Sequence, residues 1–328
     1  MIPKKKDAKG VNDYKPISMV GSIYKVIAKI LSRRLREVLP HLVGDSQSTF
    51  VRGRQILGGA LVTNEIVSWL KKKKRSSVLL KLEFEKAYDT FDWASMDIVL
   101  KEMGLGAKCR QWINACIITP SISILFNGNP CKPFKMGRGL RQGDPMSPFL
   151  FVLMTELLNW LLMKALSLGL FKGLQVGTKN ATVIHLQFAN DTLLFCEANE
   201  VFLHNIKRIL LSFQSISGLA INYSKSGLIV LGKDVAWATG IVKNLGCTLV
   251  QLPITSLGVP LGANTKKFNS WQCVIEKIQC RLNSWKGTCL SRAGRLVQIK
   301  AVLNSLPVYY LSIFKLPKKL ALEINKIQ

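Results

Sequence analysis

Acidic residues are scarce in this chain, and their scarcity is the first constraint on its partners. Only 19 Asp and Glu residues stand against 46 Lys and Arg in 328 residues, which gives a formal charge of +27 at pH 7. A surplus of this size favours a polyanionic partner, and nucleic acid is the usual one. A basic membrane protein is the competing interpretation.

Histidine is also rare, and no two cysteines form a Cys-x-x-Cys pair. The three histidines and eight scattered cysteines support neither a zinc site nor a disulfide framework. A reducing nuclear or cytoplasmic location fits this pattern. No apolar signal-peptide core follows the N-terminal Met-Ile-Pro-Lys-Lys-Lys, so secretion is not expected.

A long uninterrupted apolar run is missing as well. The most apolar stretch, residues 146–171, is interrupted by Glu156, Asn159 and Lys164. A charge at mid-span costs roughly 2.5–3.5 kcal/mol on insertion scales, so a buried core helix is favoured and no membrane partner is expected. The hydrophobic content of 48% can fill a large core, and the length predicts two or three packed subdomains.

Helical periodicity near the N-terminus predicts an amphipathic helix over residues 23–39. Its apolar side is formed by Ile23, Ile27, Ile30, Leu31 and Val38. A basic stripe accompanies it, formed by Lys25, Lys29, Arg33 and Arg36. For one helix considered alone, such a stripe is most simply a solvated face.

Strand and helix patterns alternate through the rest of the chain. Residues 78–84 predict a buried strand, and residues 183–188 and 192–196 predict a hairpin joined by Ala189-Asn190-Asp191. A helix follows from Phe202, with Gly218 as its stop. Beyond residue 250, basic helices are expected. One carries Val274, Ile278, Leu282 and Trp285, and the next runs from near Ser291 to before Pro307. This order indicates an α+β core with an appended helical subdomain.

Two acids occupy positions that suit a metal site. Glu83 lies near the end of the predicted strand, and Asp191 lies at the hairpin tip. Hard ions such as Mg²⁺ prefer charged oxygens held on rigid elements. Each acid alone also has a simpler interpretation, Glu83 as a strand-end surface acid and Asp191 as a turn former.

Ordered motifs along the whole chain add the context that single residues lack. They are Tyr14-Lys15-Pro16-Ile17-Ser18, Ser46-Gln47 to Gly53-Arg54, Lys81-Leu82-Glu83-Phe84-Glu85-Lys86-Ala87-Tyr88-Asp89, Arg138-Gly139-Leu140-Arg141-Gln142-Gly143-Asp144-Pro145-Met146-Ser147-Pro148, Phe188-Ala189-Asn190-Asp191, Ile221-Asn222-Tyr223-Ser224-Lys225-Ser226 and Leu257-Gly258-Val259-Pro260-Leu261-Gly262. In composition and order they resemble the reverse transcriptase of LINE-type (non-LTR) retrotransposons.

This resemblance implies a fold and a set of partners. The implied fold is α+β, a right-hand polymerase with a ferredoxin-like palm sheet backed by helices, plus a helical thumb. The implied domains are fingers over 1–77, palm over 78–250, and primer grip with a truncated thumb over 251–328. The implied activity is RNA-directed DNA synthesis with an RNA template, a DNA primer, dNTPs and two Mg²⁺ ions, for which Mn²⁺ can substitute. The family's endonuclease and Cys/His-rich regions are not expected on this chain.

The resemblance also implies roles for individual residues. Glu83, Asn190 and Asp191 match the catalytic acids, with Glu83 and Asp191 as metal ligands, and Lys225 matches a proton donor to the departing pyrophosphate. Tyr88 matches the ring that excludes ribonucleotides by clashing with a 2′-hydroxyl. The implied nucleotide contacts are Lys15, Arg54, Tyr88, Arg141, Gln142 and Gly143. The implied contacts to template and primer are Leu257, Gly258, Arg292 and Arg295.

Two departures from the family pattern affect the metal site. The positions of Glu83 and Asn190 are both Asp in the family. Glu83 moves its carboxylate by about 1 Å, whereas such sites tolerate only about 0.5 Å. Asn190 loses the charge, although an Asn that adopts positive φ still suits the turn.

We therefore expect impaired nucleotidyl transfer in a fold that persists. A nucleic-acid-binding remnant without catalysis is the alternative. A relative of group II intron maturases and an open reading frame that is never translated also remain open.

Overall fold

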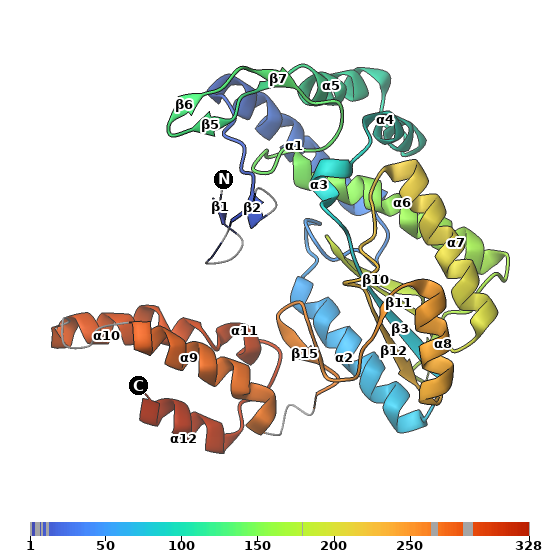
Figure 1. Cartoon of the computed structure of the whole chain (residues 1–328), viewed down its shortest axis with the longest axis vertical. Helices are drawn as coiled ribbons and strands as arrows, with labels where there is room; N and C mark the ends of the chain where they lie inside the picture. The colour runs from blue at the N-terminus through green and yellow to red at the C-terminus, as the bar shows by residue number, and fades with distance from the viewer. Residues whose placement is uncertain are drawn as a thin grey trace. The chain divides into compact units, whose positions relative to one another are not determined.

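The computed structural model describes the whole chain except residues 1, 4–6, 8, 11–12, 179, 264–267, 285–290 and 328. The chain divides into two compact units (Figure 1). The first comprises Met1–Gln55 and Lys73–Val250, and the second comprises Ile56–Lys72 and Gln251–Gln328. The helix α2 (Ile56–Lys73) thus groups with the C-terminal segment, although it lies within the range 1–77 expected for the fingers.

A five-stranded sheet forms the centre of the first unit. Its order is β10 (His185–Phe188), β11 (Asp191–Glu197), β3 (Ser77–Glu83), β12 (Gly227–Leu231) and β13 (Thr248–Leu249). The first four strands pair antiparallel, and β13 joins β12 in parallel. Because β3, β10, β11 and β12 are connected through α6 (Ser147–Ser167) and α7 (Glu200–Ser217), the topology is ferredoxin-like. The α+β fold with a ferredoxin-like sheet backed by helices is confirmed.

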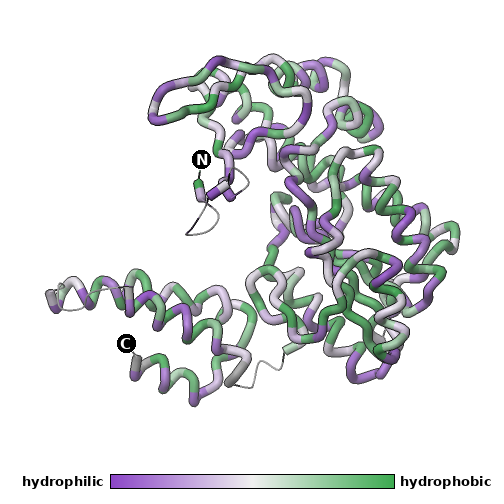
Figure 2. The backbone as a smooth tube through the Cα atoms, in the orientation of Figure 1, coloured by the Kyte–Doolittle hydropathy of each residue, from purple (hydrophilic) through white to green (hydrophobic). Residues whose placement is uncertain are grey.

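Alternation along β3 divides its side chains between two faces of the sheet. Val78, Leu80 and Leu82 belong to the same buried core as α6 and α7, so these residues face the helices. Leu79, Lys81 and Glu83 must then lie on the opposite face. Figure 2 shows the strands of this sheet mainly in the hydrophobic colour, which agrees with a sheet that is buried for most of its length.

Helix α6 is the core helix expected from residues 146–171. Within the described part of the chain it is the one helix long and apolar enough to cross a membrane. Of its most apolar 18-residue stretch, 61% is buried inside the protein. Phe151, Val152, Leu153 and Met154 are each at most 1% exposed. The helix is therefore enclosed on all sides at this turn, whereas Met163, in its second half, is 51% exposed.

The first unit contains further short strands and helices. They are β1 (Ile2–Pro3), β2 (Tyr14–Lys15), α1 (Ser22–Leu42), α3 (Ala87–Thr90), α4 (Trp93–Glu102), α5 (Ala107–Ile118), β4 (Ser121–Ile122), β5 (Leu125–Phe126), β6 (Asn129–Pro130), β7 (Phe134–Lys135), β8 (Leu174–Val176), β9 (Ala181–Val183) and α8 (Val235–Leu245).

Helix α1 confirms the predicted helix but corrects its buried face. Of the residues expected on the apolar side, only Leu31 is buried. Ile23 is 81% exposed, and Ile27, Ile30 and Val38 are 47%, 49% and 44% exposed. The buried set is Ala28, Leu31, Ser32, Leu35 and Leu39. The prediction was wrong because the helix carries two apolar stripes, and only packing against α5 and α6 selects one of them.

Local turn chemistry is visible at two places, the end of α7 and the β10–β11 hairpin. Helix α7 ends at Gly218, whose φ of 74° satisfies the predicted stop. In the β10–β11 hairpin, the positive φ of 54° belongs to Ala189. The hairpin persists with Asn190 in its connection, as expected, and the residue that adopts the left-handed conformation is Ala189, the first after β10.

The second unit is mainly helical and has its own core. Its elements are α2, β14 (Ile254–Ser256), β15 (Val259–Leu261), η2 (Phe268–Trp271), α9 (Gln272–Ser284), α10 (Arg292–Ala301), η4 (Leu303–Ser305), α11 (Val308–Leu311) and α12 (Lys318–Ile327). Trp271, Ile278, Leu303 and Leu320 are at most 1% exposed and belong to one cluster. The helices predicted after residue 250 are thus confirmed in the described residues, as α9 and α10; Trp285, expected on the first of them, lies outside those residues.

Candidate active site

The two candidate acids lie directly opposite each other in the sheet. Asp191, the first residue of β11, is the antiparallel partner of Glu83, the last residue of β3. Directly opposite side chains in such a pair share a face, with Cβ atoms about 4.5–5.5 Å apart. Burial raises the pKa of Asp191 above its ordinary value of 3.8; the charge of Lys81 opposes this shift and that of Glu83 adds to it. Two carboxylates in this arrangement favour a cation between them.

Lys225 reaches this pair from the turn before β12. Its Nζ lies 3.6 Å from Oε1 of Glu83, and both side chains are partly exposed. The Asn222 N–H donates to the Glu83 carbonyl at 2.8 Å, and the Glu83 N–H donates to Ser226 Oγ at 3.3 Å. The Lys225 N–H in turn donates to Asn222 Oδ1 at 3.1 Å. These bonds fix the turn against the end of β3, so an ammonium group stays beside the acids.

Residues 46–49 hold the hairpin tip in place through hydrogen bonds. The Gln187 N–H donates to the Ser46 carbonyl at 2.7 Å, and Gln187 accepts from Ser48 at 3.0 Å. Gln47 is fully buried, and its Oε1 accepts from the N–H of Thr49 at 3.1 Å and of Ala189 at 3.4 Å. The segment thus positions the connection that carries Asn190 and Asp191.

Tyr88 is fixed by the core. Its ring stacks on Phe151 of α6, with ring centroids 5.6 Å apart and planes 13° apart. Its carbonyl accepts from the Leu140 N–H at 2.5 Å. Burial raises the pKa of the Tyr88 hydroxyl. The ring therefore has a defined position that does not depend on a bound nucleotide.

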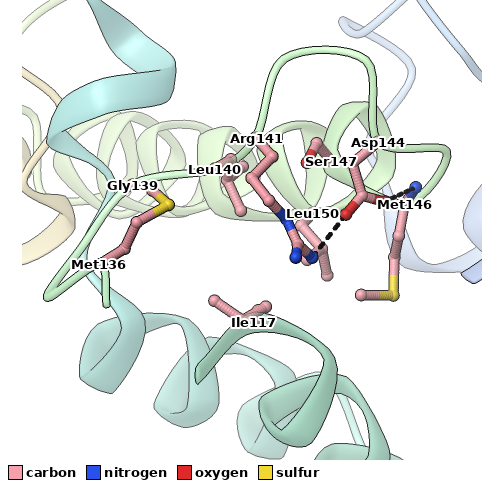
Figure 3. A pocket seen from close by; sticks show the side chains of 9 residues that line it. All are labelled: Ile117, Met136, Gly139, Leu140, Arg141, Asp144, Met146, Ser147 and Leu150. Carbon is pink, nitrogen blue, oxygen red and sulfur yellow. Dashed lines mark hydrogen bonds and ion pairs between the residues drawn. The ribbon is translucent and has the colours of Figure 1, made fainter. Parts of the chain in front are cut away.

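The Arg141 guanidinium is held by protein groups on several sides. It pairs with Asp144 at 2.7 Å, and their side chains are only 10% and 2% exposed (Figure 3). It also donates to the Cys116 carbonyl at 2.8 Å and to the hydroxyl of Tyr24, whose ring it covers at 4.4 Å. Asp144 further accepts from the Met146 N–H at 2.9 Å. These contacts give Arg141 a structural function in the loop before α6.

Arg54 is likewise engaged within the fold. Its guanidinium donates to the carbonyls of Gly44 at 2.6 Å, Gln47 at 2.8 Å and Val43 at 3.1 Å. It also pairs with Asp45 at 3.3 Å. These carbonyls follow the C-terminus of α1, where a cation is favourable. Arg54 therefore closes the loop after α1, and its contacts give no support to a nucleotide-binding function.

Gln142 and Gly143 hold the segment that carries Lys15. The Gln142 carbonyl accepts from the Ser18 N–H at 2.8 Å. Gly143 has a φ of 101°, and a Cβ there would lie 3.0 Å from the Ser18 carbonyl oxygen, so only glycine fits. Lys15 itself is exposed at the end of β2.

The candidates of the second unit lie on a turn and on a helix. Leu257 and Gly258 form the turn between β14 and β15, both with positive φ, and the Tyr309 hydroxyl donates to the Leu257 carbonyl at 2.6 Å. Arg292 and Arg295 are exposed in the first turn of α10, whose N-cap is Ser291. They stand on the surface of this unit.

The donor set at the acids fits one hard ion better than two. No group of three or more His, Cys, Asp and Glu residues is found among the residues that the structure describes. Glu83 and Asp191 supply carboxylate oxygens, and the adjacent residue Asn190 carries an amide oxygen in place of a third carboxylate. Mg²⁺ accepts such oxygens, so the set can hold an ion but carries one charge fewer than three acids.

Two functional residues were missed by sequence reasoning. Lys81 shares the sheet face of Glu83 and acts on Asp191; its position two residues before Glu83 was the available signal. Gln47 was seen only as part of a motif, and nothing local indicated that its amide would reach residue 189.

Comparison with known proteins agrees with these features. A family model described as "Reverse transcriptase (RNA-dependent DNA polymerase)" matches residues 2–261. The "Transposon TX1 uncharacterized 149 kDa protein" of Xenopus laevis is 27% identical over 318 residues, 93% of this chain and 23% of that protein. The Pol polyprotein from a type-1 R2 retrotransposable element of Popillia japonica is 26% identical over 69% of this chain and 31% of that protein.

Among solved structures, telomerase from Candida tropicalis with a telomeric RNA fragment aligns at a TM-score of 0.48, with 13% identity over 88% of this chain and 45% of that chain. The chain spans less than a third of the length of the two curated relatives, 23% and 31%. Because the family model covers residues 2–261 and the relatives are proteins of non-LTR retrotransposons, the chain belongs to the reverse transcriptase family as a reverse transcriptase domain of the non-LTR type.

Proposed function

We propose that this chain binds an RNA template with a DNA primer and that its RNA-directed DNA polymerase activity is impaired. The pairing of Glu83 with Asp191 beside Lys225 is the observation that carries the proposal. Reverse transcriptases generally use divalent metal ions and bind an RNA template, and the formal charge of +27 suits such a partner.

Glu83 and Asp191 are the residues that would hold Mg²⁺, or Mn²⁺ in its place. A bound divalent metal would supply Lewis-acid chemistry at this site, to activate the primer hydroxyl and, with a second ion, to stabilise the leaving pyrophosphate. The Lys225 ammonium group can donate a proton to that pyrophosphate. The fixed Tyr88 ring excludes a 2′-hydroxyl, so deoxynucleotides are selected by steric fit. Each of these groups is held by backbone bonds or core packing before any substrate arrives.

The impairment follows from a missing negative charge at Asn190 and from the longer side chain of Glu83. Asn190 brings no charge to the hairpin tip, and Glu83 is one methylene longer than the family's Asp. The Lys225 ammonium at 3.6 Å also competes with a metal ion for Glu83, although a pair this exposed contributes only about 0–1 kcal/mol. An ion held by two uneven carboxylates stabilises the transition state less than one held by three acids.

The remaining contacts to substrates are assigned by their exposure. Lys15 is the exposed cation for a triphosphate, next to the segment held by Gln142 and Gly143. In the second unit, the substrate contacts are Leu257 and Gly258 for the primer and Arg292 and Arg295 for the template–primer backbone. Arg54 and Arg141 are excluded from this set because their guanidiniums are bound to protein groups.

Primer extension with Mg²⁺ and with Mn²⁺ tests the proposal. The chain is compared with the double variant Glu83→Asp plus Asn190→Asp. The matched control makes the same two chemical changes at exposed positions, Glu85→Asp plus Asn199→Asp. We expect poor extension by the unmodified chain and by the control, and efficient extension by the variant Glu83→Asp plus Asn190→Asp. Robust extension by the unmodified chain would show that the metal-site argument is wrong.

A second function is favoured by the missing charge at Asn190, namely nucleic-acid binding without catalysis. It predicts salt-sensitive RNA binding that does not change with Mg²⁺ or with Asn190→Asp. If extension is absent from both the chain and the repaired variant while RNA binding persists, this second function holds.

A further inference from the structure

A surface cavity lined by arginines lies on α1 and the loop that follows it. The cavity has a volume of about 490 Å³ and is lined by Arg33, Arg36, Glu37 and Arg52. All four side chains belong to exposed residues. Among the described residues, none of the three guanidiniums has a hydrogen bond or an ion pair with another protein group. Three guanidiniums against one carboxylate leave two positive charges unneutralised, which is the chemistry of an anion site.

An aromatic surface adjoins these cations. Phe50 is 46% exposed and has a φ of 62°, which is unusual for a bulky side chain. Its ring packs on Phe149 with centroids 6.5 Å apart, and the Arg36 guanidinium lies 5.6 Å from the centroid of Phe149. An exposed ring beside guanidiniums can stack on a planar base.

The loop that supplies Phe50 and Arg52 is fixed at both ends. Ser46 and Ser48 are bonded through their backbones to Gln187 of β10. Arg54 is bonded to the carbonyls of Val43 and Gly44, at the end of α1, and of Gln47 in the loop itself. Because the loop is held before any ligand binds, the cost of ordering it on binding is small.

We propose that Arg33, Arg36, Arg52 and Phe50, here called the arginine surface, bind a single strand of nucleic acid outside the candidate active site. The guanidiniums take successive phosphates, and the Phe50 ring stacks on a base. Phosphate suits the guanidinium fork, and a nucleic-acid strand offers several phosphates in series together with planar rings. An acidic peptide would use the cations but not Phe50. This inference requires nucleic-acid binding by the chain and does not require polymerase activity.

Fluorescence anisotropy without metal or dNTPs tests the proposal. The probes are labelled single-stranded RNA and DNA oligonucleotides longer than the roughly 4–16 nucleotides that such sites cover, and an abasic strand of equal length. The test variant carries Arg33→Gln, Arg36→Gln and Arg52→Gln. The control carries Arg34→Gln, Arg208→Gln and Lys243→Gln, which remove the same charge from exposed positions outside the cavity.

The salt dependence gives the magnitude. Three phosphate contacts add about 2 to the slope of log affinity against log salt, so over a fourfold rise in salt the parent loses about 20-fold more affinity than the test variant. The variant with three Arg→Lys changes keeps the slope. Phe50→Leu weakens binding to the intact strand roughly 5- to 150-fold, the value of one base stack, and leaves binding to the abasic strand unchanged.

Other outcomes overturn the proposal. Equal slopes for the test and control triple variants would mean that only net charge matters. Phe50→Leu without effect, or equal competition by polyglutamate, would reduce the surface to a general anion site. If the RNA and DNA probes differ only in affinity, the difference shows which strand the arginine surface prefers, and the result supports the proposal. Loss of binding in the test variant with extension unchanged in the repaired enzyme separates this surface from the proposed catalytic function.

Discussion

Replacing Arg141 by methionine should destabilise the first unit by about 3 kcal/mol, because it leaves a buried carboxylate without its cation. The Asp144 side chain is 2% exposed and lies 2.7 Å from the guanidinium. Breaking a buried ion pair by removing one partner costs about 3–5 kcal/mol. Asp144 keeps bonds from the Tyr24 hydroxyl at 2.5 Å and the Met146 N–H at 2.9 Å. We therefore expect a value at the lower end of that range.

Urea unfolding of Arg141→Met and of the double variant with Asp144→Leu measures this effect. The double variant should recover part of the loss, since no unpaired charge remains buried. Arg138→Met, at an exposed position three residues earlier, is the control and should change the free energy of unfolding by less than about 0.5 kcal/mol. If Arg141→Met behaves like this control, the structural function of Arg141 is refuted and a nucleotide contact regains support.

Three further predictions concern single positions. Burial lowers the pKa of His185 from its ordinary 6.5 to about 4. As the pH falls, His185 is protonated in the unfolded chain before it is protonated in the folded chain, so its contribution to stability is complete above pH 6.5 and falls by roughly 3 kcal/mol towards pH 4. The free energy of unfolding of His185→Gln, measured against pH, should lack this loss. Gly218→Ala places a Cβ 2.4 Å from a backbone oxygen, whereas Gly246→Ala, also at positive φ, meets nothing within 4 Å; chemical denaturation should show the first variant less stable by about 1–3 kcal/mol more than the second. Gln47→Leu removes the acceptor of two backbone N–H groups, at about 1–3 kcal/mol each, and hydrogen exchange at the Ala189 amide should accelerate; an unchanged exchange rate would contradict the positioning of the hairpin by Gln47.

Residues 78–84, the hairpin at 189–191 and the helix ending at Gly218 could be predicted because their signals are local. Alternation with period two, turn residues and a glycine stop depend on backbone sterics within a few residues. The same holds for the basic helices after residue 250. The sequence by itself thus determined the kinds of elements, their order and the family.

Only the tertiary structure decided which side chains are available for function. Arg54 and Arg141 match nucleotide contacts in sequence, yet their guanidiniums are bound to protein groups. Arg54 binds the carbonyls of the loop after α1. Arg141 binds the nearby Asp144 together with Cys116 and Tyr24, which come from distant parts of the chain. Helix α1 has two apolar stripes, and packing against α5 and α6 covers one and leaves Ile23 81% exposed. The Arg141 and α1 outcomes depend on contacts between residues far apart in the chain, and the Arg54 outcome depends on how the loop after α1 folds back. A periodic pattern shows which residues of a helix or strand share a face. It carries no information about which group elsewhere in the fold that face will contact.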